Sequence, residues 1–356
     1  MYKIIRNILF LFDPEKVHYF TAASIRNILK IPGMKFIWTK LYTVEDKRLH
    51  KTLFGITFKN PVGLAAGFDK NATMYNDLAY CGFGFIEIGT VTPKGQPGND
   101  KPRLFRLKED QGIINRMGFN NDGVEIAVEN LKNKKTNVII GGNIGKNKVT
   151  PNENATDDYV YAFNQLFDYV DYFAVNVSSP NTSGLRNLQN KTYLSELCKT
   201  LMDRSAELAQ MHSIYVRPLL IKISPDLTDS EIDDVLEVAI NTGVSGIIAT
   251  NTTTSHVEHF GATPGMGGVS GKPLSKRSTE VVRYISQKAS GRLTLIAAGG
   301  IFSSEDALEK LDAGADLLQI YTGLVYEGPS LTSKINRGLL KSGRFSTASK
   351  LATKSG

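Results

Sequence analysis

The sequence predicts an α/β fold, a (β/α)8 barrel of the TIM barrel type preceded by a small N-terminal helical module. From about residue 51 onward, short apolar runs that end in Gly, Asn, Ser or Thr alternate with longer stretches of helical periodicity. About eight such runs follow one another, which is the number of strands that closes a TIM barrel of about 250 residues. The runs are almost continuously apolar, and this indicates a parallel sheet whose outer face is covered by helices.

The composition is that of a globular protein. Hydrophobic residues make up 41% of the 356 residues and charged residues 22%, which argues against a disordered, collagenous or coiled-coil chain. The two cysteines, Cys81 and Cys198, are too few for a disulfide framework or a cysteine-rich metal site. A reducing compartment is the simpler interpretation.

The first 45 residues predict three short helices. Apolar residues recur at helical spacing between Ile4 and Phe12, and Asp13-Pro14-Glu15 has the N-cap, first-turn proline and early acid of a second helix. Pro32-Gly33 ends that helix, and a third is expected around residues 36–41. The module carries many aromatic and basic residues. It is either an ordinary helical cap on the next domain or an amphipathic dock for a membrane.

The eight apolar runs are expected to form the barrel, with helices between them. We expect strands at residues 62–66, 85–88, 138–144, 173–177, 219–223, 246–249, 295–298 and 317–320. We expect helices at residues 124–132, 194–211, 229–241, 278–288 and 304–313. A doubly wound open sheet is the competing architecture, but it usually has fewer strands and a glycine fingerprint after the first one. The first turn here, Ala66-Gly67-Phe68-Asp69-Lys70, lacks that fingerprint.

The predicted organisation is a helical module at residues 1–45, a barrel at residues 46–337 and a flexible basic tail at residues 338–356. The net charge of +7 is concentrated at the two ends: residues 1–40 carry +5, residues 332–356 carry +6, and the part between them carries −4. This distribution does not fit a nucleic-acid groove, and an anionic membrane surface is the better partner. No apolar run approaches the roughly 20 residues that cross a bilayer, and neither a signal peptide nor a transit peptide is visible.

Polar residues close almost every predicted strand. Reacting groups in such a barrel come from the carboxyl ends of the strands, so these residues are the candidates for chemistry. Asparagines suit a small planar ligand with amide-like groups, although each alone could be a turn or cap residue. Lys70 and Lys222 bring positive charge to the same rim and favour an anionic ligand, unless they extend outward into solvent. The strand-closing candidates are Asp69-Lys70, Gly89-Thr90, Asn143, Asn176 with Ser178-Ser179, Lys222, Thr250-Asn251-Thr252, Gly299-Gly300 and Tyr321-Thr322.

Glycine-containing loops after the last two strands indicate a phosphate site. Gly299-Gly300-Ile301 and Tyr321-Thr322-Gly323 fall where barrels commonly bind phosphate through backbone N–H groups. Ser179 has no neighbouring His or Asp for a nucleophile triad, so hydrolysis is not expected. His256-Val257-Glu258-His259 lacks the helical spacing of a zinc motif, and no metal site is expected.

Three motifs closely resemble those of the dihydroorotate dehydrogenases. They are Asn176-Val177-Ser178-Ser179-Pro180-Asn181-Thr182, Asn115-Arg116-Met117-Gly118-Phe119-Asn120-Asn121 and Pro97-Gly98-Asn99-Asp100-Lys101-Pro102-Arg103. The resemblance runs from about Asp13 to Gly323. It implies a barrel that carries FMN and oxidises dihydroorotate to orotate in pyrimidine synthesis.

The resemblance also implies the site residues. Ser179 would take the C5 proton while C6 delivers hydride to the flavin, with a relay through Thr182 and a water, and Phe119 would help to close the site. Lys222 would stabilise negative charge on the flavin. The implied FMN contacts are Ala66, Gly67, Phe68, Asp69, Lys70, Thr90, Asn143, Asn176, Lys222, Thr250, Gly271, Gly300, Tyr321 and Thr322. The implied substrate contacts are Lys70, Asn115, Arg116, Met117, Gly118, Phe119, Asn176, Asn181, Asn251 and Thr252.

The base position and the N-terminal helices select one branch of that family. Serine at 179, where the cytosolic class has cysteine, resembles the membrane-associated class that passes electrons to a quinone. His18, Arg106 and Tyr321 match positions that line the quinone site in that class. The implied partners are dihydroorotate or orotate, a membrane quinone and an anionic membrane surface, with no nucleic acid and no partner protein. The implied location is peripheral, at the cytoplasmic face of a bacterial inner membrane.

Two alternatives remain open from the sequence. One is a related FMN barrel that acts on a different pyrimidine or uses another electron acceptor. The other is a flavin-binding or membrane-bound interaction protein without turnover, against which the intact Ser179, Lys222 and asparagine set argues.

Overall fold

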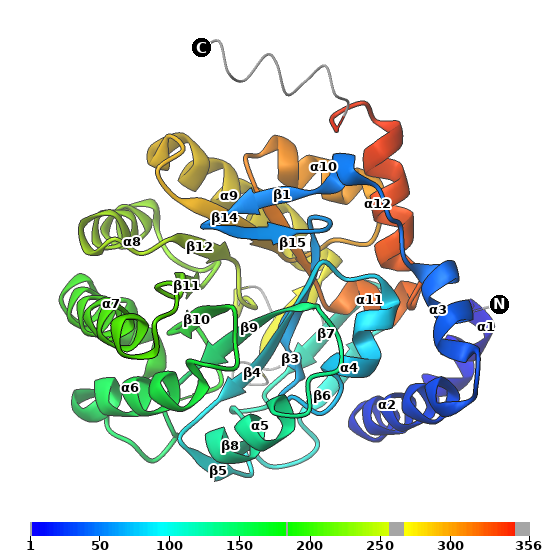
Figure 1. The fold of residues 1–356 in the computed structure, drawn as a ribbon, viewed down its shortest axis with the longest axis horizontal. Helices are drawn as coiled ribbons and strands as arrows, with labels where there is room; N and C mark the ends of the chain where they lie inside the picture. The colour runs from blue at the N-terminus through cyan, green and yellow to red at the C-terminus, as the bar shows by residue number, and fades with distance from the viewer. Residues whose placement is uncertain (1, 183, 256–266, 346–356) are drawn as a thin grey trace.

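The computed structural model describes residues 2–182, 184–255 and 267–345. Eight parallel strands close into a barrel in chain order, as the sequence predicts (Figure 1). They are β3 (Val62–Asp69), β4 (Phe85–Val91), β9 (Ile139–Ile144), β10 (Tyr172–Asn176), β11 (Leu219–Ile223), β12 (Gly246–Ala249), β14 (Thr294–Ala298) and β15 (Leu317–Ile320). The predicted bounds of the runs at 219–223, 246–249 and 317–320 are confirmed, and β3 extends to Asp69 where the run was expected to end at residue 66.

Helices surround the barrel and bury their apolar faces against it. The five predicted helices are present as α5 (Val124–Leu131), α7 (Lys191–His212), α8 (Asp229–Thr242), α9 (Ser275–Ala289) and α10 (Ser304–Asp312). The structure adds α4 (Tyr75–Leu78), α6 (Ala155–Leu166), α11 (Thr322–Glu327) and α12 (Leu331–Lys341). Short 3-10 helices lie at Lys47–Leu49, Ala79–Cys81, Asn152–Asn154, Leu185–Gln189 and Lys272–Leu274. The main core fills the space between the strands and this ring of helices.

Several short antiparallel strands were not predicted. A hairpin of β1 (Lys51–Leu53) and β2 (Ile56–Phe58) covers the amino-terminal end of the barrel, where Phe58 packs edge-on against Phe85 with ring centroids 5.4 Å apart. The strands β6 (Leu104–Leu107), β7 (Gly112–Asn115) and β13 (Gly268–Gly271) form a second sheet. A third pairs β5 (Lys94–Gln96) with β8 (Asn121–Gly123). These strands have only three or four residues, too few for alternation to stand out in a sequence.

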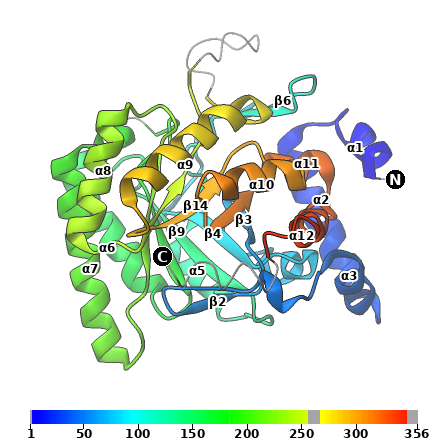
Figure 2. The same cartoon turned by 90° about the horizontal axis from the view of Figure 1, so that it is seen from above.

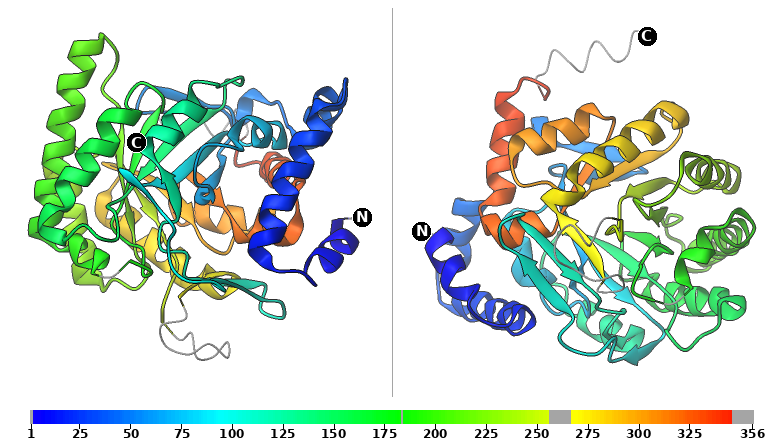
Figure 3. Two further views of the ribbon diagram at one scale, coloured as in Figure 1. Left: turned by 90° about the horizontal axis from the view of Figure 1, so that it is seen from below. Right: turned by 180° about the vertical axis from the view of Figure 1, so that it is seen from behind.

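The N-terminal module consists of α1 (Tyr2–Leu9), α2 (Pro14–Lys30) and α3 (Met34–Tyr42), the three helices that the sequence predicts. Asp13 caps α2 by accepting a hydrogen bond from the backbone N–H of Lys16. Figures 2 and 3 show the three helices outside the ring of barrel helices, on the side of α11 and α12. No helix within the described residues is long and apolar enough to cross a membrane.

The expected start of the tail, residue 338, falls inside α12. This helix continues because Leu331, Ile335 and Leu339 recur every four residues and are all buried against the barrel. The tail residues 346–356 and the motif at 256–259 lie outside the described residues. Within the described residues there is no group of three or more His, Cys, Asp or Glu side chains placed to hold a metal ion.

Candidate active site

A cavity opens at the carboxyl ends of the barrel strands, where the sequence places its polar residues. Most of the residues expected to bind a cofactor line it, together with the expected catalytic residues Ser179 and Lys222. The expected cofactor contacts in the lining are Ala66, Gly67, Lys70, Thr90, Asn176, Lys222, Thr250, Gly271, Gly300, Tyr321 and Thr322. The fold therefore gathers residues from the whole length of the barrel into one cavity.

Three residues of the expected cofactor set lie elsewhere. Phe68 lines a neighbouring cavity, and Asn143 is fully buried beneath the first one. Asp69 turns away because its carboxylate accepts hydrogen bonds from the backbone N–H groups of Thr73, Met74 and Tyr75, at 2.7 to 2.9 Å. Asp69 thus shapes the turn after β3, and a direct cofactor contact by its side chain is not what the structure shows.

The expected substrate residues also meet in the cavity, with one exception. Lys70, Asn115, Met117, Gly118, Phe119, Asn176, Asn181, Asn251 and Thr252 all line it. Arg116 does not, because its guanidinium donates to the carbonyl oxygen of Pro102, at 2.9 and 3.2 Å, outside the cavity. The amide of Asn181 donates to Asn115 at 3.2 Å, so residues from two distant loops are already joined.

A hydrogen-bonded chain of amides and hydroxyls forms the floor of the cavity. Thr90 Oγ1 donates to Asn143 Oδ1 at 2.5 Å, and Asn176 Nδ2 donates to Thr90 Oγ1 at 2.9 Å. Asn251 Nδ2 donates to Asn176 Oδ1 at 3.3 Å. Each side chain holds the next in one orientation, so the remaining donors and acceptors face a ligand in fixed positions.

Two functional candidates escaped the sequence analysis. Glu87 is a fully buried carboxylate on β4 whose Oε1 lies 3.4 Å from Lys222 Nζ. Gln319 on β15 lines the cavity and donates from Nε2 to Glu87 Oε2 at 2.7 Å. The available signal was a single polar residue inside an otherwise apolar strand, in Phe85-Ile86-Glu87-Ile88 and again in Leu317-Leu318-Gln319-Ile320.

Lys70 lies at the boundary between the two cavities and lines both. Burial lowers the pKa of its ammonium to about 8, partly offset by the negative charge of Glu15. An anionic ligand would stabilise the charged form of this lysine, because it compensates for the hydration that the ammonium loses on burial.

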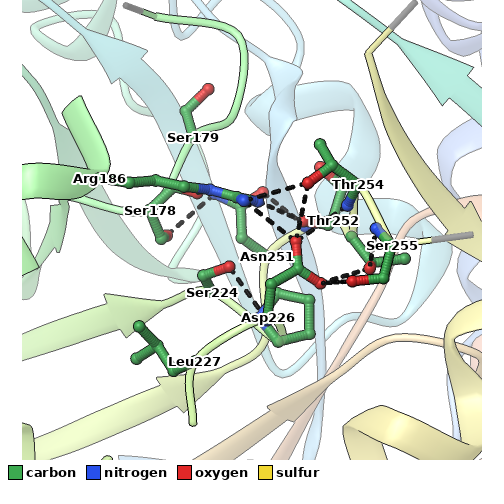
Figure 4. A network of polar contacts seen from close by, with 12 residues as sticks. Ser178, Ser179, Arg186, Ser224, Asp226, Leu227, Asn251, Thr252, Thr254 and Ser255 are labelled. Atoms are coloured by element: carbon green, nitrogen blue, oxygen red, sulfur yellow. Dashed lines mark hydrogen bonds and ion pairs between the residues drawn. The ribbon is translucent and has the colours of Figure 1, made fainter. Parts of the chain in front are cut away.

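Ser179 is buried in the loop after β10, and Asn181 donates its backbone N–H to Ser179 Oγ at 3.3 Å. Arg186 holds this loop against the loop after β12: it donates to the carbonyl oxygens of Ser178 and Thr252 and pairs with Asp226 at 3.0 Å (Figure 4). The Asp226 carboxylate also accepts from the hydroxyls of Thr253, Thr254 and Ser255 and from the Thr254 backbone N–H. The two loops that face the cavity are therefore joined by one network of hydrogen bonds and an ion pair.

The cavity has the features of a site built around a ligand. Thr250 Oγ1, Thr252 Oγ1 and Gln319 Oε1 are buried without a hydrogen-bond partner, although they belong to residues that line it. Such orphaned polar atoms are costly unless a ligand or water satisfies them. At Gly300, where φ is +75°, an added Cβ would lie 2.3 Å from Ser275 Cβ. The close backbone there is suited to cradling a phosphate.

A second cavity adjoins the first and is much more apolar. Helices α1 and α2 form one wall of it, and the expected residues His18, Arg106 and Tyr321 all line it. The two cavities share Lys70, Leu104, Ile113, Met117 and Tyr321, so a single layer of side chains separates them.

Aromatic rings connect the layer shared by the two cavities to the N-terminal module. His18 packs against Phe68 with ring centroids 4.8 Å apart, and Phe68 packs against Tyr321 at 5.5 Å. Burial, followed by the charge of Lys70, lowers the pKa of His18 to about 4, so this imidazole is neutral near pH 7. Arg106 lies over the ring of Phe10 and donates to the carbonyl oxygen of Phe12 at 2.7 Å.

The chain is similar to one family over almost its whole length. A family model described as dihydroorotate dehydrogenase matches residues 48–342. The curated dihydroorotate dehydrogenase (quinone) of Christiangramia forsetii is 56% identical over 345 residues, covering 96% of this chain and 100% of the relative. The protein of the same name from Vibrio parahaemolyticus is 47% identical, covering 95% of this chain and 100% of the relative.

Solved structures agree with the family model. The Eimeria tenella enzyme in complex with ferulenol superposes with a TM-score of 0.79 at 35% sequence identity, covering 93% of this chain and 91% of that chain. Its ligand-free form superposes with a TM-score of 0.78 at 37% identity, covering 88% of this chain and 93% of that chain.

Proposed function

Because the chain belongs to the dihydroorotate dehydrogenase family, we propose that the polar cavity is where dihydroorotate is oxidised and that the apolar cavity receives a quinone. The protein oxidises dihydroorotate to orotate with a quinone as electron acceptor. The observation that carries the assignment of the two cavities is their shared wall of Lys70, Met117 and Tyr321. Adjoining compartments suit a site that takes electrons from a polar substrate and passes them to an apolar one.

The family uses a flavin, and FMN is the form that we propose here. The glycine cradle at Gly300, the unpartnered hydroxyl of Thr250 and the unpartnered amide oxygen of Gln319 support a flat, phosphorylated ligand with its own donors and acceptors. Backbone N–H groups in the loops after β14 and β15 would hold the phosphate. When bound, the flavin supplies the two-electron acceptor for the substrate hydride.

Dihydroorotate carries a carboxylate and two ring amide groups, and the lining offers partners for each. Lys70 would bind the carboxylate, since its buried ammonium gains from an anion. Asn115, Asn181 and Asn251 present amide groups that can both donate to and accept from the ring.

Ser179 is the proposed proton acceptor. Its hydroxyl would take the proton from C5 of the substrate while C6 gives up a hydride, which leaves the C5–C6 double bond of orotate. Serine is a weak base in water, so burial of Ser179 and the unpartnered hydroxyl of Thr182 support a relay that carries the proton onward. Lys222, which lines the same cavity, would stabilise the negative charge that the flavin gains on reduction.

The N-terminal module is the proposed membrane contact. Its helices and the turn between α1 and α2 expose large apolar side chains: Ile8 is 56% exposed, Leu11 77%, Phe12 61%, Phe20 63% and Phe36 72%. These residues belong to the same module as α1 and α2, the helices that line the apolar cavity, and a membrane in contact with them would give a quinone a direct path from the lipid into that cavity. Basic residues of the same module favour an anionic surface, and we place the protein at the cytoplasmic face of a bacterial inner membrane.

Anaerobic stopped-flow absorbance tests the two half-reactions separately. Dihydroorotate should bleach the flavin band, and a short-chain quinone should then restore it. Ser179→Ala should keep the flavin but lose most bleaching by dihydroorotate. Unchanged bleaching would remove Ser179 as the base, and absent bleaching in the flavin-loaded wild type would contradict the substrate assignment.

Liposome binding tests the membrane contact. Leu11→Ser with Phe12→Ser should weaken binding to anionic liposomes and turnover with a long-chain quinone, while leaving bleaching by dihydroorotate unchanged. Met211→Ser is the matched control, because Met211 is 70% exposed on α7, on the opposite side of the barrel (Figure 1). Equal binding by both variants would overturn the assignment of the membrane face.

A further inference from the structure

Within the described residues, the interior of the barrel contains one carboxylate, that of Glu87, held by four donors from four different strands. Its Oε1 accepts from Asn143 Nδ2 at 2.8 Å and lies 3.4 Å from Lys222 Nζ. Its Oε2 accepts from Gln319 Nε2 at 2.7 Å and from the Tyr172 hydroxyl at 3.2 Å. The donors come from β9, β10, β11 and β15, so the carboxylate joins strands from most of the barrel wall.

Burying the Glu87 carboxylate requires space in the barrel interior and is energetically unfavourable without partners. Gly141 is the register partner of Glu87 on β9, and a Cβ at that position would lie 2.2 Å from Tyr172 Cζ. The glycine thus lets the Tyr172 ring reach the carboxylate. Barrel interiors are usually filled by bulky apolar residues, and a buried carboxylate is expensive unless it is paired and hydrogen-bonded. The opposite charge that faces Glu87 within the described residues is Lys222.

We infer that Glu87 is a positioning residue that holds both the location and the positive charge of Lys222 at the floor of the flavin cavity. Lys222 and Gln319 line the cavity, whereas Glu87 lies beneath it and acts only through them. By binding Nε2 of Gln319, Glu87 also turns the unpartnered Oε1 of that amide into the acceptor available to a ligand. This inference rests on the proposed function in one respect, that the ligand above Lys222 is a flavin.

The other titratable groups near Lys222 can be separated from it. Burial, followed by the charge of Glu87, raises the pKa of Tyr172 far above its ordinary value, so its hydroxyl stays a neutral donor. Burial raises the pKa of Tyr321 to about 12. Lys70 does change charge near pH 8, but it lies at the wall shared with the apolar cavity and is common to every variant compared below.

Glu87→Gln should make the charge of Lys222 depend on pH and on the redox state of the flavin. Glutamine fills the same space but removes the counter-charge, and a buried ammonium without one gives up its proton more readily. If the cavity that Lys222 lines holds a flavin, its reduction would add negative charge near Lys222 and would favour return of that proton. Each extra proton taken up on a two-electron reduction makes the midpoint potential fall by about 30 mV more per pH unit.

The experiment is a redox titration between pH 6 and 9 with a chemical reductant and indicator dyes, so it does not depend on dihydroorotate. Glu87→Gln should gain the additional slope of about 30 mV per pH unit, and Glu87→Asp, which keeps the charge, should not. In the Lys222→Met background, Glu87→Gln should cause no further change of slope. A wild-type slope in Glu87→Gln, or an equal steepening in the Lys222→Met background, would overturn the inference.

A second measurement covers the case in which Glu87→Gln does not retain flavin. In flavin-free Lys222→Met, the carboxylate of Glu87 has lost its counter-charge and should take up a proton. Infrared spectra should then show a carboxylic acid band that is absent from Lys222→Met with Glu87→Gln. If the two spectra are identical, the coupling of Glu87 to Lys222 is refuted. Because neither measurement uses dihydroorotate, a failed substrate assignment would leave both results interpretable.

Discussion

The pair of Glu15 and Arg103 attaches the N-terminal module to the barrel, and its removal should loosen helix α2. Arg103 Nη2 lies 2.7 Å from Glu15 Oε1, Nε lies 3.1 Å from Oε2, and both side chains are more than 90% buried. The carbonyl oxygens of Pro97 and Asn99 accept from the remaining Nη1 of Arg103. All three nitrogens of the guanidinium thus donate hydrogen bonds, and those to Glu15 hold the pKa of that carboxyl below its ordinary value.

Glu15→Gln removes the charge and leaves Arg103 buried without a counter-ion. Breaking a buried pair in this way costs about 3–5 kcal/mol, and we expect the lower end because glutamine keeps one acceptor. At 1.36 kcal/mol for each factor of ten, about 3 kcal/mol makes local opening of α2 roughly 150-fold more frequent. Glu15 also lines the apolar cavity, so KM for quinone should rise while flavin reduction by dihydroorotate stays normal.

Hydrogen exchange of the α2 amides measures this opening directly. A double-mutant cycle is completed by the single variant Arg103→Met and by the double variant Glu15→Gln with Arg103→Met. In the double variant α2 should open less often than in Glu15→Gln alone, because no unpaired charge remains buried. Acid should have the same effect as Glu15→Gln. Because the pKa of Glu15 is lower in the folded protein than in the unfolded chain, the pair contributes its full stability above about pH 4.5, and this contribution is lost as the pH falls through the pKa of the folded state. Less than a threefold change in α2 exchange in Glu15→Gln would refute the reasoning.

Three further predictions concern the polar cavity. Gly300→Ala should weaken flavin binding at least tenfold, because its φ of +75° disfavours alanine and the new Cβ would lie 2.3 Å from Ser275 Cβ; fluorescence titration of the flavin-free protein measures it. Orotate binding should weaken about tenfold per pH unit above pH 8, because Lys70 loses its charge as the pH rises through its pKa of about 8; calorimetry across pH 6.5–9.5 measures it. Asp226→Asn should lower kcat/KM for dihydroorotate about 10- to 100-fold without changing reoxidation by quinone, because the ion pair with Arg186 that joins the two loops is lost.

Each of these has a matched control. Gly291→Ala has the same backbone strain, with φ of +77°, but open space around the new Cβ, so it should keep normal flavin affinity. Lys70→Met should bind orotate weakly at every pH, and a pH-dependent loss that persists in it would assign the titration to another group. Asp233→Asn removes a carboxylate from an exposed pair with Lys288 and should not alter turnover. An Asp226→Asn variant with wild-type kcat/KM would show that the loops hold their positions without the pair.

The short continuous apolar runs predict most of the barrel, because whether a strand is buried on both faces shows in its own residues. A buried parallel strand must be apolar on both faces, so each of the eight strands is visible as a short run with a polar end. The same rule places Thr90, Asn176, Lys222 and Thr250 at one rim, and all four line the cavity. The helix signals of the N-terminal module are equally local, as the Asp13 cap and the turn at Gly33 show.

The direction of individual side chains at that rim is not local. Asp69 and Lys70 are neighbours in the sequence, yet one binds the backbone of the following turn and the other enters the cavity. Phe68 faces the apolar cavity for the same reason, since an alternating strand sends its residues to opposite sides, whereas Asn143 stays on the cavity side, in the hydrogen-bonded floor. A motif match marks which residues are near a site without specifying which of them face it.

The sequence by itself determined the fold class, the rim that carries the chemistry, the helices of the N-terminal module and, through its motifs, the family. Only the tertiary structure decided how charges and cavities are combined. Glu87 and Lys222 are 135 positions apart and meet because barrel closure and strand register bring β4 and β11 to face each other. The shared wall between the two cavities depends likewise on α2 packing beside the turn after β3. The cost of burying a charge is local, but the partner that offsets it is set by the closed barrel.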